Sequence, residues 1–247
     1  SMGKKQAGLL LTGFMALALV LSGPGMSQAA ENDWAKTAHL TLEQPLEGEF
    51  PGQVMVAQQG LVIRSQLIQE NGLNLSYPQV YLAENPEASR KISRYLKKVA
   101  EKSRKDYEKA NVHSEKLTSY IHYRLCHYGE GYLSVREYGM DYFERAAHPL
   151  SWERGYTFSL KTGELVKWQD LVPKHQKALF TLEKINEKLW ATPYGTGHYF
   201  YPEFKGLEKL PENYYLDPDG SIHFLFQPYE IAPYAVGIID LSMQNGI

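Results

Sequence analysis

The stretch LTSYIHYRLCHYGEGYLSVREYGM, residues 117–140, has a clear two-residue period. Leu117, Ile121, Tyr123 and Leu125 share one face with Ser119, and this alternation is typical of a β-strand with one buried face. Gly129-Glu130-Gly131 is a turn signal, and the period resumes over 132–140. We therefore predict an antiparallel hairpin centred on this turn.

A helix is predicted immediately upstream, over residues 86–109. Asn85 is a plausible N-cap, Pro86 suits the first helical position, and Glu87 complements the positive end of the helix dipole. The apolar stripe at helical spacing contains Ile92, Leu96, Val99 and Ser103, with Tyr95 and Ala100 beside it. The basic residues Lys97, Lys98, Lys102 and Arg104 face away from that stripe, and we interpret them as a solvated surface.

Strand and helix signals also alternate in the remaining sequence. Residues 61–68 and 156–160 are predicted strands, and the turn at 161–163 leads into a short further strand. After Pro173 the apolar spacing predicts a second helix that extends to about residue 189.

The C-terminal segment reads as another hairpin. Asp217-Pro218-Asp219-Gly220 is a turn signal, the residues 222–226 alternate in polarity, and 238–243 reads as a final strand. Clustered strands interrupted by two helices predict an α+β fold, with antiparallel sheets and two main helices packed on them.

The first 30 residues have the layout of a secretory signal. Lys4 and Lys5 precede an apolar run over about 7–21, and small residues end the segment at 27–30. We expect an extracytoplasmic protein, whether periplasmic, secreted or at the cell surface; the alternative is an uncleaved membrane anchor. The predicted organisation is a signal peptide at 1–30, an N-terminal strand-helix-strand module at 31–145 and a C-terminal α+β module at 146–247, the two modules packed as one globular unit.

Charge and cysteine content limit the function classes. Without Lys4 and Lys5, 24 basic residues face 28 acidic ones, a formal charge of −4. With no basic stripe interleaved with aromatic residues, we expect no nucleic-acid partner. Cys126 is the single cysteine, so the fold holds without an intramolecular disulfide.

The stretch QPYEIAPYAVG, residues 227–237, interrupts the last two predicted strands. Pro228 and Pro233 lack an amide proton, so strand pairing ends at both and the segment between them is stiff. Two interpretations remain open. Either Tyr229 and Tyr234 are contact residues that lose little entropy when a partner binds, or both pack inward while Glu230 caps a backbone amide.

A long aromatic stretch at 191–212 is predicted to be a loop. Its side chains, Tyr199 and Tyr201 among them, either stack on sugar rings or peptide as part of a mobile lid, or cover an otherwise bare sheet face.

The run FLFQPYEIAPYAVG at 224–237, preceded by YYLDPDGSIHF, closely resembles the C-terminal signature of the RsiV-like and PdaC-like family of bacterial extracytoplasmic domains. The family's Lys-Thr-Gly and Asp-Leu elements are matched at 161–163 and 170–171, and its tyrosine-proline lead-in at 77–78. Its Gly-Ala-His element is matched only in part, because Ala146 replaces the glycine before Ala147-His148. The resemblance covers roughly residues 55–243.

This resemblance implies a ligand- or protein-binding module. In anti-sigma factors the family's domain binds lysozyme, and in peptidoglycan deacetylases it precedes the catalytic domain. We expect neither attachment in this chain, so lysozyme sensing does not transfer directly. The family's tyrosine-proline loop is implicated in partner contact, which makes Pro228, Tyr229, Glu230, Pro233 and Tyr234 the leading candidates.

Residue patterns for chemistry are weak. On a strand, His122 and Cys126 lie about 13 Å apart, too far to share one metal ion. Cys126 is expected to be a small buried side chain, and His148 to fix its own loop through backbone hydrogen bonds. Acidic residues such as Glu137, Asp141 and Glu144 are assigned to solvent or salt bridges.

We therefore expect a non-enzymatic binding domain with no catalytic residue, metal or cofactor. Its partner is a protein or a peptidoglycan fragment, and a membrane is involved only through an uncleaved signal segment. The predicted ligand-binding residues are Pro228, Tyr229, Glu230, Pro233, Tyr234, His148, Tyr199 and Tyr201. The alternative is an enzyme that processes cell-envelope polysaccharide or peptidoglycan, or an accessory subunit of one.

Overall fold

The computed structural model describes residues 43–111 and 116–243. The predicted signal segment, and the part of the first module before residue 43, lie outside the described residues. Within them, no helix has the length and apolar character needed to cross a bilayer.

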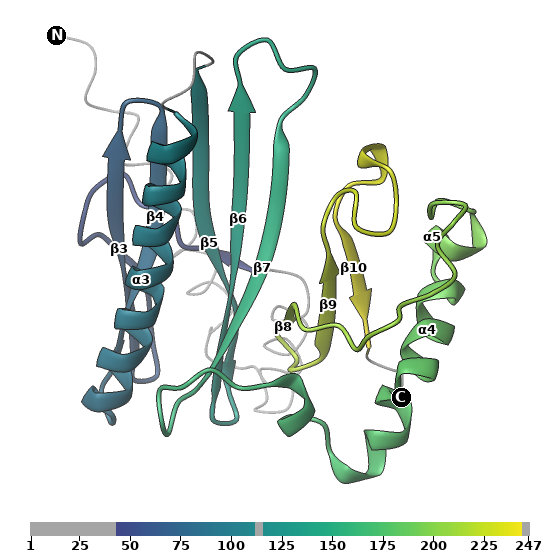
Figure 1. Cartoon of the computed structure of the whole chain (residues 1–247). Coiled ribbons are helices and arrows are strands. Elements are labelled where there is room, and N and C mark those ends of the chain that lie inside the picture. The colour runs from purple at the N-terminus through teal and green to yellow at the C-terminus, as the bar shows by residue number, and fades with distance from the viewer. Residues whose placement is uncertain (1–42, 112–115, 244–247) are drawn as a thin grey trace, which may run out of the picture. The chain divides into compact units, whose positions relative to one another are not determined.

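The predicted hairpin forms the middle of a seven-stranded sheet (Figure 1). β5 (Leu117–Gly129) pairs with β6 (Tyr132–Phe143) along its whole length, from Leu117 opposite Phe143 to Gly129 opposite Tyr132. A β-bulge between Leu125 and His127 shifts the register. Because of this bulge Leu125, Cys126 and His127 are all buried, instead of alternating between faces.

The order in this sheet is β2-β3-β4-β5-β6-β7, and the short β1 pairs with β5. The remaining bounds are β1 (Gln44–Pro45), β2 (Val54–Gln58), β3 (Leu61–Glu70), β4 (Leu73–Leu82) and β7 (Leu150–Ser159). Neighbouring strands are antiparallel except β4 and β5, which pair in parallel over a short stretch from Leu73 opposite Ser119. α3 (Pro86–Ala110) is the crossover between these two strands, and Figure 1 shows it lying along them.

α3 begins as its sequence predicts, and Ile92, Leu96 and Ala100 are buried as expected. Of the other predicted stripe residues, Val99 and Ser103 are half-buried and Tyr95 is exposed. The Asn85 side chain accepts a hydrogen bond from the backbone nitrogen of Ala88 at 3.1 Å. It also donates to the backbone oxygens of Leu160 and Lys161, which ties the helix start to the end of β7. The buried helix residues are Ala88, Ser89, Ile92, Leu96, Ala100 and Tyr107. All but Ser89 belong to the hydrophobic core of the large sheet.

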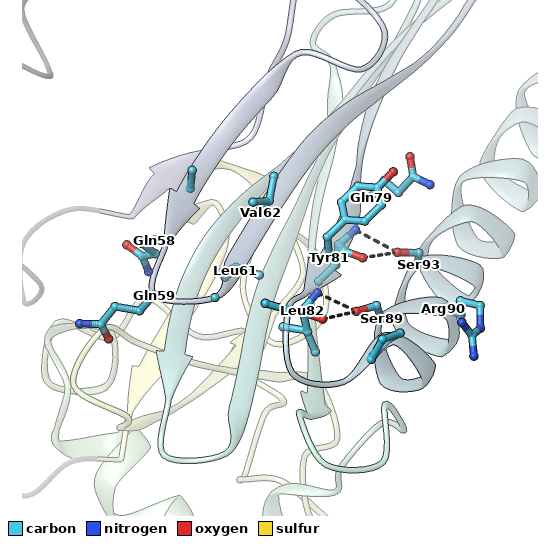
Figure 2. A pocket seen from close by; sticks show the side chains of 15 residues that line it. Gln58, Gln59, Leu61, Val62, Gln79, Tyr81, Leu82, Ser89, Arg90 and Ser93 are labelled. Atoms are coloured by element: carbon cyan, nitrogen blue, oxygen red, sulfur yellow. Dashed lines mark hydrogen bonds between the residues drawn. The ribbon is translucent and has the colours of Figure 1, made fainter.

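β4 was not predicted as a strand, and Pro78 at its centre explains why. Beyond Leu75, β4 has no register partner in β5, so one of its edges is open. Two serines of α3 occupy that edge: the backbone nitrogen of Val80 donates to Ser93, and that of Leu82 donates to Ser89 (Figure 2). Since backbone nitrogens alternate in direction along a strand, that of Pro78 faces the same open edge, where no ladder hydrogen bond is lost.

The C-terminal elements form a second sheet with its own core. β8 (Tyr214–Leu216), β9 (Ile222–Phe226) and β10 (Ile239–Ser242) are antiparallel in the order β10-β9-β8. α4 (Leu182–Ala191) contributes its buried residues Ile185 and Leu189 to this core.

Three details of the second half differ from the prediction. The predicted helix after Pro173 is split into a 3-10 helix (Lys174–Phe180) and α4, because the Thr181 side chain caps α4 by accepting from the backbone nitrogen of Lys184. The strand expected after 161–163 is reduced to one bridge between Phe158 and Leu165. The 191–212 loop contains a short helix, α5 (Pro193–Thr196). Remaining 3-10 turns span Trp168–Asp170 and Tyr234–Val236.

The two sheets meet at β6, β7 and β8. Gly155 of β7 lies so close to β8 that a β-carbon there would be 1.7 Å from the backbone oxygen of Tyr214. The Ser134 hydroxyl accepts from the backbone nitrogen of Leu216 at 3.0 Å. β7 pairs with β6 and so belongs to the large sheet. The predicted second module, residues 146–247, therefore begins with a strand of the large sheet. The α+β fold class, with antiparallel sheets and two main helices, is confirmed.

Candidate functional site

The candidate site is built around the segment that joins β9 to β10, residues 227–237. Tyr229 has a φ of 70°, a left-handed conformation that is uncommon for a residue other than glycine. Ile231 and Ala232 are buried in the second core and anchor the segment. Pro233 precedes the 3-10 turn that contains Tyr234. The Pro-Tyr pairs thus lie on either side of a buried apolar anchor.

The two tyrosines form a group of rings with His148, which lies in the loop between β6 and β7. The His148 and Tyr234 rings stack with centroids 3.6 Å apart and planes 13° apart. The Tyr229 ring centroid lies 5.8 Å from that of Tyr234 and 6.5 Å from that of His148. We call these three residues the ring group. Two loops distant in the sequence are thereby brought into contact.

Hydrogen bonds define the roles of the two His148 nitrogens. Nδ1 lies 3.0 Å from the backbone oxygen of Pro149, which can only accept, so Nδ1 carries the proton of this bond. In the neutral ring Nε2 then accepts from the Tyr229 hydroxyl at 3.2 Å. Tyr229 remains 49% exposed, whereas His148 and Tyr234 are half-buried.

Side-chain amides fasten the segment to the free edge of β7. Gln227 accepts from the backbone nitrogen of Glu153 at 3.0 Å and donates to the backbone oxygen of the same residue at 2.6 Å. Asn213 extends this pattern by donating to the Glu153 oxygen and accepting from the Gly155 nitrogen. These amides take the hydrogen bonds that a neighbouring strand would make, so the base of the segment is rigid.

Each of the two sequence interpretations holds for part of the segment. Tyr229 points to solvent, as a contact residue would. Glu230 caps a backbone amide, because its carboxylate accepts from the Gln227 nitrogen at 2.7 Å. A single description of the segment as either exposed or inward-packed is therefore wrong.

Of the two aromatic-loop candidates, only Tyr201 is linked to this segment by a hydrogen bond. Its backbone nitrogen donates to the Ile231 oxygen at 3.0 Å. Tyr199 is 56% exposed, and in the described part of the chain it makes no ring contact with the ring group. Between them, Phe200 is buried against Trp190 and Phe204. The loop thus serves in part as a cover for the second core.

Sequence reasoning missed a charged cluster centred on His223 of β9. Its Nε2 lies 2.7 Å from Asp217 and its Nδ1 lies 2.6 Å from Asp240. Burial alone would lower the pKa of His223, but the hydrogen bonds to both carboxylates outweigh it and raise the pKa to about 9. Arg136 of β6 contacts Asp240 at 3.3 Å and Glu43 at 2.7 Å, which links the two sheets.

Both ring nitrogens of His223 are occupied by carboxylates, so neither is free to accept a proton from a substrate or to bind a metal. The Tyr215 hydroxyl also donates to Asp240. The cluster is therefore suited to holding the sheets together. Asp217 lies in the same hairpin as His223, but Asp240 and Arg136 are distant in the sequence, so no local signal could have identified the whole cluster.

Glu137 was expected to lie in solvent or in a salt bridge, and it forms a salt bridge from a buried position. Its side chain is 0% exposed and accepts from the Tyr123 hydroxyl at 2.7 Å and from Trp152 Nε1 at 3.0 Å. Arg154 lies 3.8 Å away. The carboxylate is thus a buried, hydrogen-bonded part of the core.

Cys126 is buried, as expected, and burial raises the pKa of its thiol well above the usual value, which disfavours the reactive thiolate. Among residues 43–111 and 116–243, no three histidine, cysteine or acidic side chains converge as metal ligands.

A hollow of about 760 Å³ lies between the β2–β3 turn, the end of β4 and the first turns of α3 (Figure 2). Tyr81, Arg90 and the two edge serines line it, and none of the predicted site residues does. Ser89 and Ser93 are already bonded to β4, so their hydroxyls are satisfied within the fold.

Comparison with known proteins gives a family of unknown function. Residues 169–244 match the family model described as "Protein of unknown function (DUF3298)", so this part of the chain contains a DUF3298 domain. No curated protein matches the sequence.

Two solved structures from that family are similar to the chain. The Pseudomonas aeruginosa PAO1 protein has 15% sequence identity and a TM-score of 0.49, with 80% of this chain and 92% of that chain covered. The Bacteroides fragilis NCTC 9343 protein has 16% identity and a TM-score of 0.46, with coverages of 74% and 88%.

Proposed function

We propose that this chain is an exported, non-catalytic binding domain that recognises a protein or a cell-wall fragment through the ring group and residues 228–234. The proposal rests on one observation. The exposed Tyr229 ring lies next to the rings of His148 and Tyr234, on a segment that is hydrogen-bonded to β7. In finer terms we assign the chain to the RsiV-like and PdaC-like kind of module, whose signature its C-terminal residues resemble, and a lysozyme-like protein is the first partner to test.

Preorganisation supports this proposal. Binding normally costs about 0.5–1.5 kcal/mol for each side chain that must be immobilised. The Tyr229 ring is already restrained by its hydroxyl contact with His148, and the backbone below it is fixed through Gln227. A partner would therefore meet an aromatic surface that loses little further freedom. Tyrosine is also enriched among the residues that dominate binding energy at interfaces.

The chemistry of the ring group suits two kinds of ligand. The faces and edges of stacked rings pack against apolar side chains or the flat faces of sugar rings, and the tyrosine hydroxyl adds a directional hydrogen bond. Both a protein surface and a glycan chain offer such contacts.

His223 also supports a binding role over catalysis, because both of its ring nitrogens are committed to carboxylates. His148 is the residue on which the alternative, an envelope-processing enzyme, would depend. Its Nδ1 is held by its own loop and its Nε2 by Tyr229, so neither is free for general-base work in this arrangement.

The test is a binding titration with lysozyme and, separately, with soluble peptidoglycan fragments, using immobilised wild-type protein and the double variant Tyr229→Ala/Tyr234→Ala. We expect the double variant to bind at least 10-fold more weakly, as for a hot-spot residue. Tyr81→Ala is the matched control, because Tyr81 is a comparably exposed tyrosine on β4 and should leave affinity unchanged. Equal binding by wild type and double variant would refute the assignment.

The enzyme alternative is checked in parallel. Turnover of labelled cell wall by wild type, abolished in a folded His148→Ala variant, would replace the binding proposal with a catalytic one.

A further inference from the structure

The exposed face of α3 carries a concentration of positive charge. The helix contains nine basic and four acidic residues, in a chain whose formal net charge is −2. Its first half, up to Ala100, holds five of the basic residues, Arg90, Lys91, Arg94, Lys97 and Lys98, with Glu87 as its only acid. All five are exposed, whereas the apolar stripe of the helix is buried against the large sheet.

The two halves of the helix differ in how their charges are compensated. In the second half Lys102 pairs with Asp106 at 2.8 Å, and Arg104 pairs with Glu101 at 2.5 Å. For the five cations of the first half, no carboxylate of the described chain lies within ion-pair distance.

This arrangement is unfavourable for the helix itself. Like charges three or four residues apart, such as Arg90 with Arg94 and Arg94 with Lys98, each destabilise a helix by about 0.2–0.5 kcal/mol. Since these charges do not stabilise the helix, binding of an external anionic ligand is the role that their arrangement suits.

Two hollows flank the uncompensated cations, with Arg94 lining both. One, of about 390 Å³, is lined by Arg90, Arg94 and Lys97 together with Gln66, Tyr77, Gln79 and Ser93. The other, of about 350 Å³, is lined by Lys91, Arg94, Tyr95, Lys98, Gly163, Glu164 and Leu165. The first hollow therefore places two side-chain amides beside the cations. Gln66 donates through Nε2 to Oε1 of Gln79 at 2.9 Å, so Oε1 of Gln66 and Nε2 of Gln79 are the atoms that suit a ligand with hydroxyl groups as well as negative charge.

The surroundings of the five cations on α3 argue against two kinds of polyanion, a lipid surface and a nucleic acid. The apolar stripe is used by the sheet, so the exposed apolar surface beside the cations consists of scattered side chains such as Tyr95, Leu165 and, next to Arg90, Tyr81, which is too little for insertion into a lipid surface. The Tyr95 ring is held edge-on by Tyr156 and Phe158, with centroids 6.0 and 5.7 Å away. Tyr81 and Tyr95 line different hollows, and two separated rings are a poor platform for successive stacked bases.

We propose that the first half of α3 is a binding surface for a linear polyanion of phosphate-linked polyol or sugar units. Its phosphates lie along the cations, which recur every three or four residues and are thus about 5–6 Å apart, while its hydroxyls enter the hollow beside Gln66 and Gln79. This surface shares no residue with the ring group, and the two are tested independently.

The experiment measures binding of fluorescent poly(glycerol phosphate) to the full chain, with neutral dextran as the uncharged control polymer. Two triple variants each remove three positive charges from the same helix: Arg94→Gln/Lys97→Gln/Lys98→Gln in the first half and Lys102→Gln/Lys105→Gln/Lys109→Gln in the second. Circular dichroism and thermal unfolding establish that both variants keep the fold.

We expect saturable binding that weakens with added salt, a loss of at least 10-fold in the first-half variant, and less than threefold in the second-half variant. Equal losses in the two variants would mean a general effect of net charge and would overturn the proposal, as would the absence of binding. Tighter binding to phosphatidylglycerol vesicles or to an oligodeoxythymidylate, lost in the same variant, would replace the polymer with a membrane or a nucleic acid and would equally overturn it.

Discussion

Replacing His223 tests whether the charged cluster holds the two sheets together. The cluster raises the pKa of His223 from 6.5 to about 9, and a tenfold change in proton affinity corresponds to about 1.36 kcal/mol. The protonated imidazole therefore contributes about 3 kcal/mol to the free energy of unfolding. Because the folded-state pKa is the higher one, this contribution is fully present below pH 6.5 and is lost as the pH rises through about 9.

The assay is urea unfolding of wild type and His223→Gln at several pH values from 6 to 10. Glutamine keeps hydrogen-bonding capacity but no charge, so the variant should be about 3 kcal/mol less stable at pH 6, and the two curves should converge near pH 10. His175→Gln is the control, because His175 is exposed on the 3-10 helix and forms no ion pair among the described residues. Parallel curves for wild type and His223→Gln across this range would refute the reasoning.

Acid unfolding tests the carboxylate partners of His223 in the same cluster. Burial would raise the pKa of Asp217, but its hydrogen bonds, chiefly that with His223, lower it to about 2. A depressed carboxylate pKa stabilises the fold above pH 3.8, and this contribution is lost as the pH falls through about 2. It is the same interaction seen from the carboxylate, so it does not add to the histidine contribution.

Three further substitutions have defined outcomes in chemical denaturation. Gly139→Ala would place a β-carbon 1.9 Å from the Trp152 ring, so we expect about 1–3 kcal/mol of destabilisation and a shifted tryptophan fluorescence spectrum; an unchanged spectrum would contradict it. Tyr123→Phe removes a donor from buried Glu137 and should cost about 1–3 kcal/mol; an unchanged free energy of unfolding would contradict this. Asn85→Ala removes the α3 cap and two hydrogen bonds to backbone oxygens at the end of β7, with an expected loss of about 1–2 kcal/mol; a change below about 0.5 kcal/mol would contradict this role.

Local sequence signals predicted the elements whose causes are local. The helix over 86–109 was predicted from Asn85, Pro86 and the apolar spacing, and it forms as Pro86–Ala110. The hairpin over 117–140 followed from alternation and a glycine turn. Such features depend on residues within one or two turns of each other, so their physics can be read along the chain.

Elements whose stability comes from distant partners were missed. β4 contains Pro78, and it is a strand because it pairs with β3 along its whole length. α3 supplies Ser89 and Ser93 to its open edge. A single helix was predicted after Pro173 because the capping ability of Thr181 was not considered. Thr181 is the N-cap of α4, so a separate helix begins there.

The candidate site also has features set by the local sequence and features set by contacts between distant residues. The sequence by itself determined that Pro228 and Pro233 end strand pairing, since proline has no amide proton in any context. Only the tertiary structure decided that Tyr229 and Tyr234 meet His148, or that His223 lies between Asp217 and Asp240. Those contacts depend on how loops and strands from separate parts of the chain are juxtaposed, because hydrogen bonds and ring stacking act over only a few ångströms and sequence spacing does not fix distances in space.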